Sequence, residues 1–336
     1  MPDTLWADTM RPSDEARKPA GDQPPSIAVV IPSRNRRELL LRAIRSVLDQ
    51  DLSDFELIVV DDASKDGSPD AVEAIADRRI KLIRQETPLG ANPARNRGLL
   101  AATAPIVAFL DSDDEFEAHK LSTVLAIFNG QGDLGTLVDS YKIINPGKRG
   151  GRPEDLINHV IRTSEAFLPA LFDSTVKERR LRKATSGMTV RREVALRAGL
   201  FNEEVQRRQD MEFLIRLAKT ARCATTDQCL WIKHEQAQSI SFTGDGFIAA
   251  TLLMGRSHPI YAGKRAYQAA DVVMYLWETI KRRRFRQLGR DLSLLGSELG
   301  SIRAASLIGQ GLWAWQVDAR LETALRKRRW SDRQKA

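Results

Sequence analysis

The chain has 336 residues, 42% of them hydrophobic, and a formal net charge of +8 at pH 7. This length allows one large domain or two with a substantial core. No apolar run approaches the roughly 20 residues that span a bilayer. The charge favours anionic partners, but we find no finger spacing, RNA-binding strand motif or basic recognition helix, so nucleic acid is not an expected partner. Cys223 and Cys229 lack metal-site spacing and predict reduced thiols in a cytoplasmic protein.

Residues 1–25 are rich in Pro, Asp, Arg and Lys and contain no signal-peptide core, so we predict a disordered tail. After this tail, apolar runs alternate with amphipathic stretches. Strands are expected at residues 27–31, 56–60, 80–83 and 106–110. Helices are expected at residues 39–50 and 70–76, and a loop at residues 90–98 is expected to enter a helix that runs to about residue 102. Such repeats predict an α/β fold with a mainly parallel, doubly wound sheet. Pro32 is expected to stop the first strand.

Carboxylates follow two of the expected strands, namely Asp61 and Asp62, and then Asp111, Asp113 and Asp114. Ligands of open α/β sheets bind outside the carboxyl ends of the strands, where all five should lie. Crowded carboxylates repel one another unless a divalent cation, with a phosphate behind it, sits among them. Oxygen ligands suit Mg2+ or Mn2+. A solvated acidic turn is the alternative reading.

The usual dinucleotide-binding and P-loop signatures are missing. The segment after the first strand, residues 32–36, contains no glycine, whereas an NAD or FAD enzyme of the common type has G-x-G-x-x-G there. The chain also has no Walker A loop. These observations disfavour both classes.

Four ordered motifs carry a family resemblance: VVIPSRNR, ELIVVDDASKDGS, GANPARNRG and IVAFLDSDDEF. Together they resemble the inverting nucleotide-sugar glycosyltransferases of family 2, which have a GT-A fold. The resemblance implies a UDP- or GDP-linked sugar donor, a hydroxyl acceptor that is lipid- or polysaccharide-linked, and Mn2+ or Mg2+ as cofactor. It implies donor-binding roles for Pro32, Arg34, Asp61, Asp62, Asn92, Arg95, Asn96, Asp111, Ser112 and Asp113. It makes Asp113, Asp114 and His234 the candidate metal ligands.

Asp210 is the candidate catalytic base. It lies in an expected helix with an apolar face formed by Phe213, Leu214 and Leu217, and an acid there also favours the helix dipole. The resemblance gives this position to the base, although Gln209 departs from the acidic residue that usually precedes it. His234 opens a segment, residues 234–241, that resembles the family's closing motif. An ordinary surface histidine is the alternative.

The segments between these motifs are less patterned. Strands are expected at residues 134–144 and 229–232, a glycine- and arginine-rich loop at 145–153, and a helix at 191–198. The basic stretch 177–183 reads as a solvated helix face or as an attractor of phosphate groups.

The C-terminal region, residues 244–336, is expected to be helical and to follow a GT-A domain at residues 26–243. A leucine stripe predicts core packing against the catalytic domain, with a homodimer seam or a membrane-facing surface as alternatives. The stripe comprises Leu288, Leu292, Leu295, Leu299 and Ile302. Basic clusters at 281–286 and 326–330 lie beside aromatic residues, a combination that holds proteins on anionic membranes.

The predicted function is therefore transfer of a sugar in surface or exopolysaccharide assembly, in the cytoplasm or peripherally on the inner face of the cell membrane. Two alternatives stay open. One is a non-catalytic sugar-nucleotide-binding or scaffold protein. The other is a sugar nucleotidyltransferase, which would usually need a glycine-rich loop after the first strand.

Overall fold

The computed structural model describes residues 24–144, 153–172, 181, 184–235, 246–259, 265–301 and 303–310. Several predictions concern residues outside these ranges. They are the tail up to residue 23, the loop at 145–152, most of the basic stretch 177–183, residues 236–241, Ile302 and the basic cluster at 326–330.

The described strands form one mixed sheet. They are β1 (Ile27–Ser33), β2 (Phe55–Asp61), β3 (Ile80–Arg84), β4 (Ile106–Phe109), β5 (Glu115–Phe116), β6 (Leu134–Ile144), β7 (Glu154–Leu156), β8 (Met188–Arg191) and β9 (Arg222–His234). Their order is β3-β2-β1-β4-β8-β6-β9-β5, with β7 paired to β6. The predicted parallel arrangement is confirmed for β1 to β4 and recurs between β6 and β9, whereas β8, β5 and β7 pair antiparallel with their neighbours.

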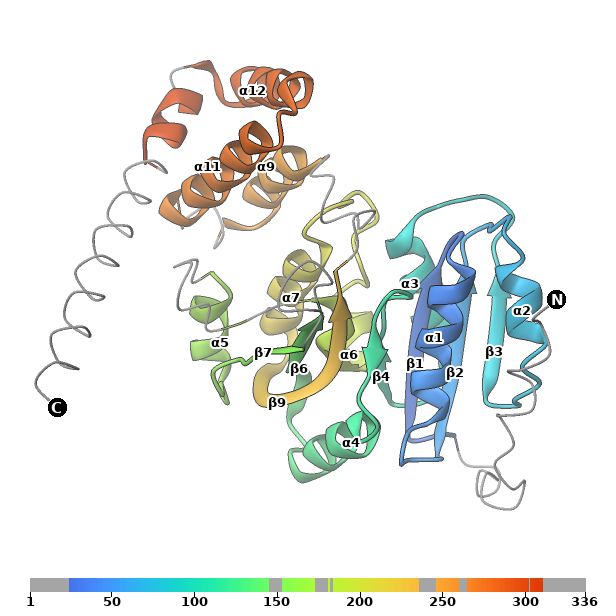
Figure 1. Ribbon diagram of the computed structural model, residues 1–336. Coiled ribbons are helices and arrows are strands. Elements are labelled where there is room, and N and C mark those ends of the chain that lie inside the picture. The colour runs from blue at the N-terminus through green and yellow to red at the C-terminus, as the bar shows by residue number, and fades with distance from the viewer. Residues whose placement is uncertain are drawn as a thin grey trace, which may run out of the picture.

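Helices cover both faces of the sheet (Figure 1). They are α1 (Arg37–Leu48), α2 (Ser68–Glu73), α3 (Ala91–Ala101), α4 (Lys120–Gly130), α5 (Ser164–Leu171), α6 (Arg192–Arg197), α7 (Gln209–Thr220), α9 (Phe247–Ser257), α11 (Arg265–Lys281) and α12 (Phe285–Leu299), with a 3-10 turn, η3 (Thr185–Gly187). Along β1, Val29 and Ile31 pack into the core under α1, and Val30 packs into the core under α3. Burial on both faces explains why this strand is apolar at successive positions.

Pro32 does not stop β1, which continues to Ser33. The carbonyl oxygen of Val30 accepts a hydrogen bond from the backbone N–H of Leu110, on the side of β1 that faces β4. The backbone of position 32, two residues later, points to the same side, but β4 has already ended there. A residue without an N–H is tolerated there because the strand has become an edge on that side.

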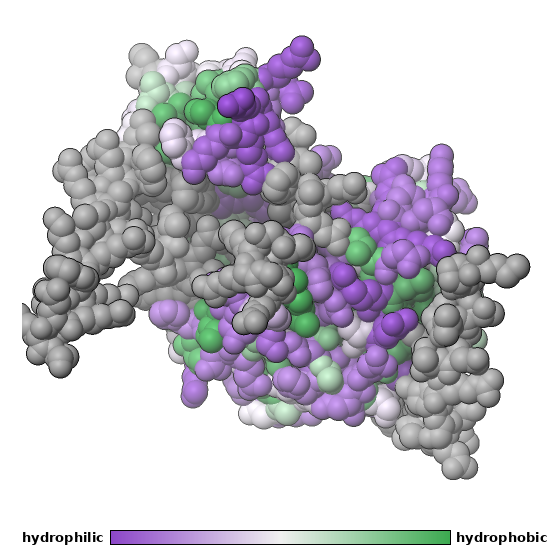
Figure 2. Space-filling view, viewed as in Figure 1, coloured by the Kyte–Doolittle hydropathy of each residue, from purple (hydrophilic) through white to green (hydrophobic). Residues whose placement is uncertain are grey.

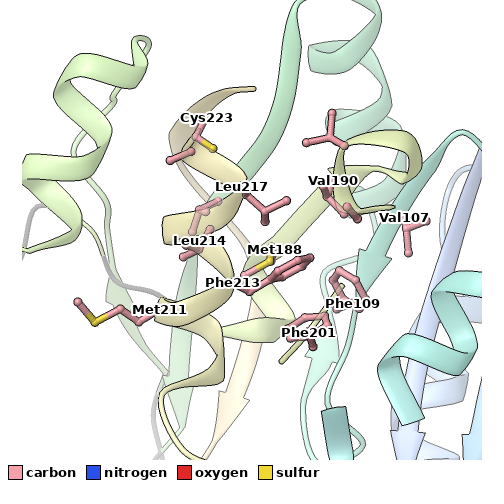
Figure 3. Packing of buried hydrophobic residues seen from close by; sticks show 14 of the residues in the cluster. Val107, Phe109, Met188, Val190, Phe201, Met211, Phe213, Leu214, Leu217 and Cys223 are labelled. Carbon is pink, nitrogen blue, oxygen red and sulfur yellow. The ribbon is translucent and has the colours of Figure 1, made fainter. Parts of the chain in front are cut away.

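An aromatic column joins α7 to β4 (Figure 3). The ring of Phe213 lies 4.1 Å from that of Phe201, which lies edge-on to Phe109 at 5.2 Å. Leu214 and Leu217 are fully buried beside them, which confirms the predicted apolar face of α7. This packing holds the start of α7 opposite the carboxyl end of β4.

The leucine stripe of α12 packs differently from the prediction. Leu295 is buried in a cluster with residues of α9 and α11, and Leu288 and Leu299 pack against that cluster. Leu292 is 42% exposed. The stripe therefore builds the core of the helical region itself, because α9 stands between it and the catalytic domain (Figure 1). None of the described helices is both long and apolar enough to cross a membrane.

Candidate functional site

A pocket of about 540 Å³ lies at the carboxyl ends of β1 and β4, facing the start of α7. Eight residues singled out from the sequence line it: Pro32, Arg34, Asp62, Arg95, Asp111, Ser112, Asp113 and Asp210. Segments up to about 180 residues apart in the sequence thus meet at one edge of the sheet. Of the five carboxylates expected at this edge, Asp62, Asp111 and Asp113 line the pocket, and Asp61 and Asp114 do not.

The two lining carboxylates of the β4–β5 connection are each paired with an arginine. Arg95 Nη2 donates to Asp111 Oδ1 at 2.6 Å, and Arg36 Nη1 donates to Asp113 Oδ2 at 2.7 Å. Arg42 also donates to the backbone oxygen of Asp113 at 2.6 Å. A cation and a phosphate were expected to offset the repulsion between these carboxylates, but the arginines already supply part of that compensation.

Asp114 lies behind the pocket wall with its carboxylate turned into the protein. Its side chain accepts hydrogen bonds from Ser186 Oγ at 2.6 Å and from the backbone N–H of His234 at 3.3 Å. Burial raises the pKa of Asp114 to about 7, although the nearby Lys233 ammonium acts in the opposite direction. Asp114 therefore supports the pocket wall and is not one of the residues that line the pocket.

The predicted metal ligands are not brought together. The His234 imidazole Nε2 lies 2.6 Å from Glu115 Oε1, so the ring faces Glu115. In the described parts of the chain, no three His, Cys, Asp or Glu side chains converge as a ligand set. Asp111 and Asp113 do present two carboxylates to the pocket, and hard cations are often bound by one or two carboxylates plus water and substrate phosphate oxygens. The residues fit a cation held jointly with a diphosphate.

The acidic pair after β2 has mainly structural contacts. Asp62 accepts hydrogen bonds from the backbone N–H groups of Leu89 at 2.7 Å and Gly90 at 3.0 Å. It thereby holds the loop that leads into α3, where Gly90 adopts a φ of 102° that disfavours other residues. Asp61 is buried and accepts from the N–H of Ser64. Asp62 therefore shapes the pocket wall that it lines.

Asn92 and Asn96 were expected at the donor, and the structure gives them other contacts. Asn92 Nδ2 donates to the carbonyl oxygens of Asn202 and Val205 at 2.9 and 2.8 Å. Asn96 exchanges two hydrogen bonds with the backbone of Phe201. Both amides therefore anchor α3 to the segment that precedes α7, and their donor-binding roles are not supported by these contacts.

Asp210 occupies the first turn of α7 and lines the pocket half-buried. Its Oδ1 accepts a hydrogen bond from the N–H of Met211 at 2.7 Å. The helix follows Arg208, which adopts the left-handed region with a φ of 58°. This backbone turn directs the beginning of the helix, and the acid on it, towards the sheet edge.

Sequence reasoning missed several cations that line the pocket: Arg36, Arg207, Arg208 and Lys233. Burial alone would lower the pKa of Lys233, but Asp114 and Asp111 hold it above its ordinary value. Each of these residues adjoins or lies within a motif that was recognised. Their proximity to those motifs, together with the net charge of +8, was the available signal.

A sheet-edge pocket with paired carboxylates after β4, and an acid at the start of the opposing helix, is the arrangement of a GT-A glycosyltransferase. Residues 28–195 match the family described as Glycosyl transferase family 2, and the chain belongs to this family of enzymes. The match covers β1 to α6 and stops before α7, so it contains the β4 carboxylates but not Asp210.

Curated relatives of the chain are also glycosyltransferases or polysaccharide biosynthesis proteins. An uncharacterized glycosyltransferase of Nostoc sp. is 35% identical over 50% of this chain and 51% of its own length. Succinoglycan biosynthesis protein ExoO of Rhizobium meliloti is 33% identical over 47% of this chain and 45% of its own. WfgD of Escherichia coli, a UDP-Glc:alpha-D-GlcNAc-diphosphoundecaprenol beta-1,3-glucosyltransferase, is 36% identical over 35% and 47%. The matched segments span about half the length of these relatives.

Solved structures show the same fold. Staphylococcus aureus TarS 1–349 matches with a TM-score of 0.60 at 18% identity, over 89% of this chain and 91% of that chain. Its complex with UDP-GlcNAc matches with the same TM-score at 17% identity, over 89% and 92%. At this identity the likeness concerns the fold alone.

Proposed function

We propose that this chain moves a sugar from a nucleotide-diphosphate donor to a hydroxyl acceptor with inversion at the anomeric carbon. One observation carries the proposal, namely that Asp111, Asp113 and Asp210 line a single pocket. A hydroxyl is a poor nucleophile, so Asp210 takes its proton as the attack proceeds. The departing nucleoside diphosphate gains negative charge, which the lining cations, Arg208 and Lys233 among them, stabilise.

The proposal includes a divalent cation, Mg2+ or Mn2+, held by Asp113 and Asp111 together with diphosphate oxygens. When bound, such a cation neutralises charge on the leaving group. Asp113 keeps one carboxylate oxygen, Oδ1, outside its ion pair with Arg36, and Asp111 keeps Oδ2 outside its pair with Arg95. These oxygens are the proposed ligands.

We further propose a uridine-linked donor and a lipid-linked acceptor in surface or exopolysaccharide assembly. The activity for which WfgD is named, with UDP-Glc as donor and a diphosphoundecaprenol-linked sugar as acceptor, supports both. A glucosyltransferase of Campylobacter jejuni, 40% identical over 30% of this chain and 34% of its own length, is likewise named for a PP-undecaprenol substrate. A GDP-linked donor is the alternative within the same chemistry.

A peripheral membrane position would bring the site to such an acceptor. At the α11–α12 corner, Trp277 is 46% and Phe285 62% exposed, next to the exposed cations Lys281, Arg283 and Arg286. Hydrophobic and strongly hydrophilic surfaces adjoin over this helical region at the top of Figure 2. Apolar side chains among cations suit the interface of an anionic bilayer.

Replacing the base tests the proposed reaction. Asp210→Asn keeps the side-chain volume but cannot accept the proton, so we expect transfer to fall by about 10²- to 10⁴-fold. Titration calorimetry with UDP should give an unchanged affinity. The control is Asp227→Asn, which alters an exposed aspartate of β9. Asp210→Asn turnover within threefold of the wild type would remove Asp210 from this role.

A further inference from the structure

Helix α9 packs on two sides. Its Met254 is fully buried in the core of the catalytic domain, in the same cluster as Met211 and Leu214 of α7. Its Ile248 is fully buried in the core of the C-terminal helices, together with Leu295. In Figure 1, α9 lies between α7 and α12. Within the described residues, α9 therefore connects the helical region to the helix that carries Asp210.

The first polar contact reaches the residue before α7. Arg208 Nη1 donates to Thr251 Oγ1 of α9 at 3.2 Å. The Arg208 guanidinium also lies over the Phe247 ring, 5.0 Å from its centroid. Arg208 carries the positive φ that begins the helix, and a non-glycine residue in that region is held by its surroundings. Two side chains of α9 provide part of that support.

The second polar contact reaches the first turn of α7 from within the core. Glu212 has a 3% exposed side chain and pairs with Arg216 at 2.6 Å and with His258 Nε2 at 3.1 Å. His258 directly follows the last residue of α9 and is itself buried. Burial opposes ionisation of Glu212, but these two partners keep its pKa below the ordinary value. The carboxylate is thus a charged, fully partnered link between two helices.

The geometry of these contacts centres on the acid. Arg208 and Glu212 lie two residues before and two residues after Asp210. Their partners are Phe247 and Thr251, which are four residues apart and share one face of α9, and His258, which directly follows the helix. The first turn of any helix has N–H groups without partners and opens easily. In this protein the first turn of α7 is held by the contacts of Arg208 before Asp210 and of Glu212 after it.

We infer that His258 and Thr251 are positioning residues, through which α9 aims the Asp210 carboxylate into the pocket. This rests on the proposed role of Asp210 as base. It assigns the C-terminal helices a part in the active site although none of them supplies the base. An enzyme whose general base is misplaced has a lower turnover rate, whereas the residues on other walls of the pocket still bind the donor.

The test compares His258→Leu and Thr251→Val with Arg256→Gln. Arg256 lies on α9 two residues from His258 and pairs with Glu298 of α12, so its loss leaves α7 untouched. We expect kcat to fall about tenfold in the first two variants. UDP affinity should stay within twofold in His258→Leu, whose contact with Glu212 lies outside the pocket lining, and kcat should be unchanged in the control. His258→Gln, which retains a donor for Glu212, should recover part of the loss. Wild-type kcat in both His258→Leu and Thr251→Val would overturn the inference.

Coupling to Asp210 separates positioning from a general structural effect. If His258 acts through Asp210, adding His258→Leu to Asp210→Asn should lower the residual rate no further. A second tenfold loss would overturn the inference.

Hydrogen exchange gives a readout independent of catalysis. The amides of residues 209–213 should exchange faster in His258→Leu and Thr251→Val than in Arg256→Gln. Unchanged exchange in the two α9 variants would contradict the inference whatever the enzyme transfers. Full activity of Asp210→Asn, by contrast, would refute the proposed function while leaving the exchange result to stand.

Discussion

At the scale of single residues, aspartates that look equivalent in the sequence have different surroundings. Asp111 and Asp113 lie at the pocket against arginines. Asp114, one position further, is 2% exposed and bonded to Ser186. Asp62 holds backbone N–H groups. A motif therefore indicates where carboxylates gather, whereas the direction of each side chain decides what it does.

Metal dependence tests the assignment of Asp113. Chelation with EDTA should abolish transfer, and Mn2+ should restore it. Asp113→Asn removes a charged ligand, so the half-activating Mn2+ concentration should rise by at least the roughly tenfold cost of losing an outer-shell partner. Asp227→Asn serves as the matched control. Equal Mn2+ dependence in wild type and Asp113→Asn would contradict the proposed metal site.

The two thiols should react at different rates. Cys223 is fully buried, and burial raises its pKa to about 12, so it stays a protected thiol at pH 8. Cys229 is only half-buried. A colorimetric thiol reagent should modify Cys229 first and Cys223 only on unfolding. Cys229→Ser should therefore show no early reaction, and an early signal of one thiol in that variant would be inconsistent with the burial of Cys223.

At the scale of elements, α3 lies unusually close to the sheet. A Cβ on Gly98 would overlap the Val30 side chain and lie 3.3 Å from Val60 Cγ2. Gly98→Ala should therefore destabilise the protein by about 1–3 kcal/mol through overpacking. Gly130→Ala at the end of α4, where nothing lies within 4 Å, should be close to neutral. Urea unfolding of both variants measures the difference, and equal midpoints would contradict this packing argument.

The elements that the sequence predicted are those with a clear apolar pattern, such as the continuous apolar run of β1 and the helical period of α7. β8 was not assigned, because four residues carry no clear period. Its place between β4 and β6 depends on pairings with residues about 50 to 85 positions away. The contacts of Asn92 and Asn96 with the segment before α7 could not be predicted for the same reason. Which face of α3 meets the pocket depends on a segment about 100 residues later.

At the scale of the whole molecule, eight of the residues that line the pocket followed from the family motifs, but the contacts of α9 with the start of α7 did not. Thr251 and His258 belong to no motif, and their partners are 43 and 46 residues away. The leucine stripe of α12 was correctly predicted to be part of a core, but the elements that it packs against were not predicted. An amphipathic pattern identifies the buried face of a helix and does not identify the surface that covers it.

Membrane association belongs to this scale because it involves the surface of the whole helical region. We expect the full chain to co-float with vesicles that contain anionic lipid at low salt, and to be released by high salt because screening weakens the attraction. Phe285→Ser should weaken binding, whereas Leu89→Ser, an equally exposed apolar site far along the chain, should not. Failure to bind anionic vesicles at low salt would reject the membrane proposal.

The reversed direction of β8 has a consequence for how the family can diversify. Because β8 runs opposite to β4, its beginning lies at the same rim at which β4 and β9 end, and Ser186 of η3, just before β8, accepts a hydrogen bond from the N–H of Asp111 there. The side of the cleft that we propose binds the nucleotide thus comes from the first third of the chain, and the opposite side comes from later, separately connected segments. We expect natural variants to change their acceptor preference by changes in those later connections, while the segments that are proposed to bind the nucleotide stay the same.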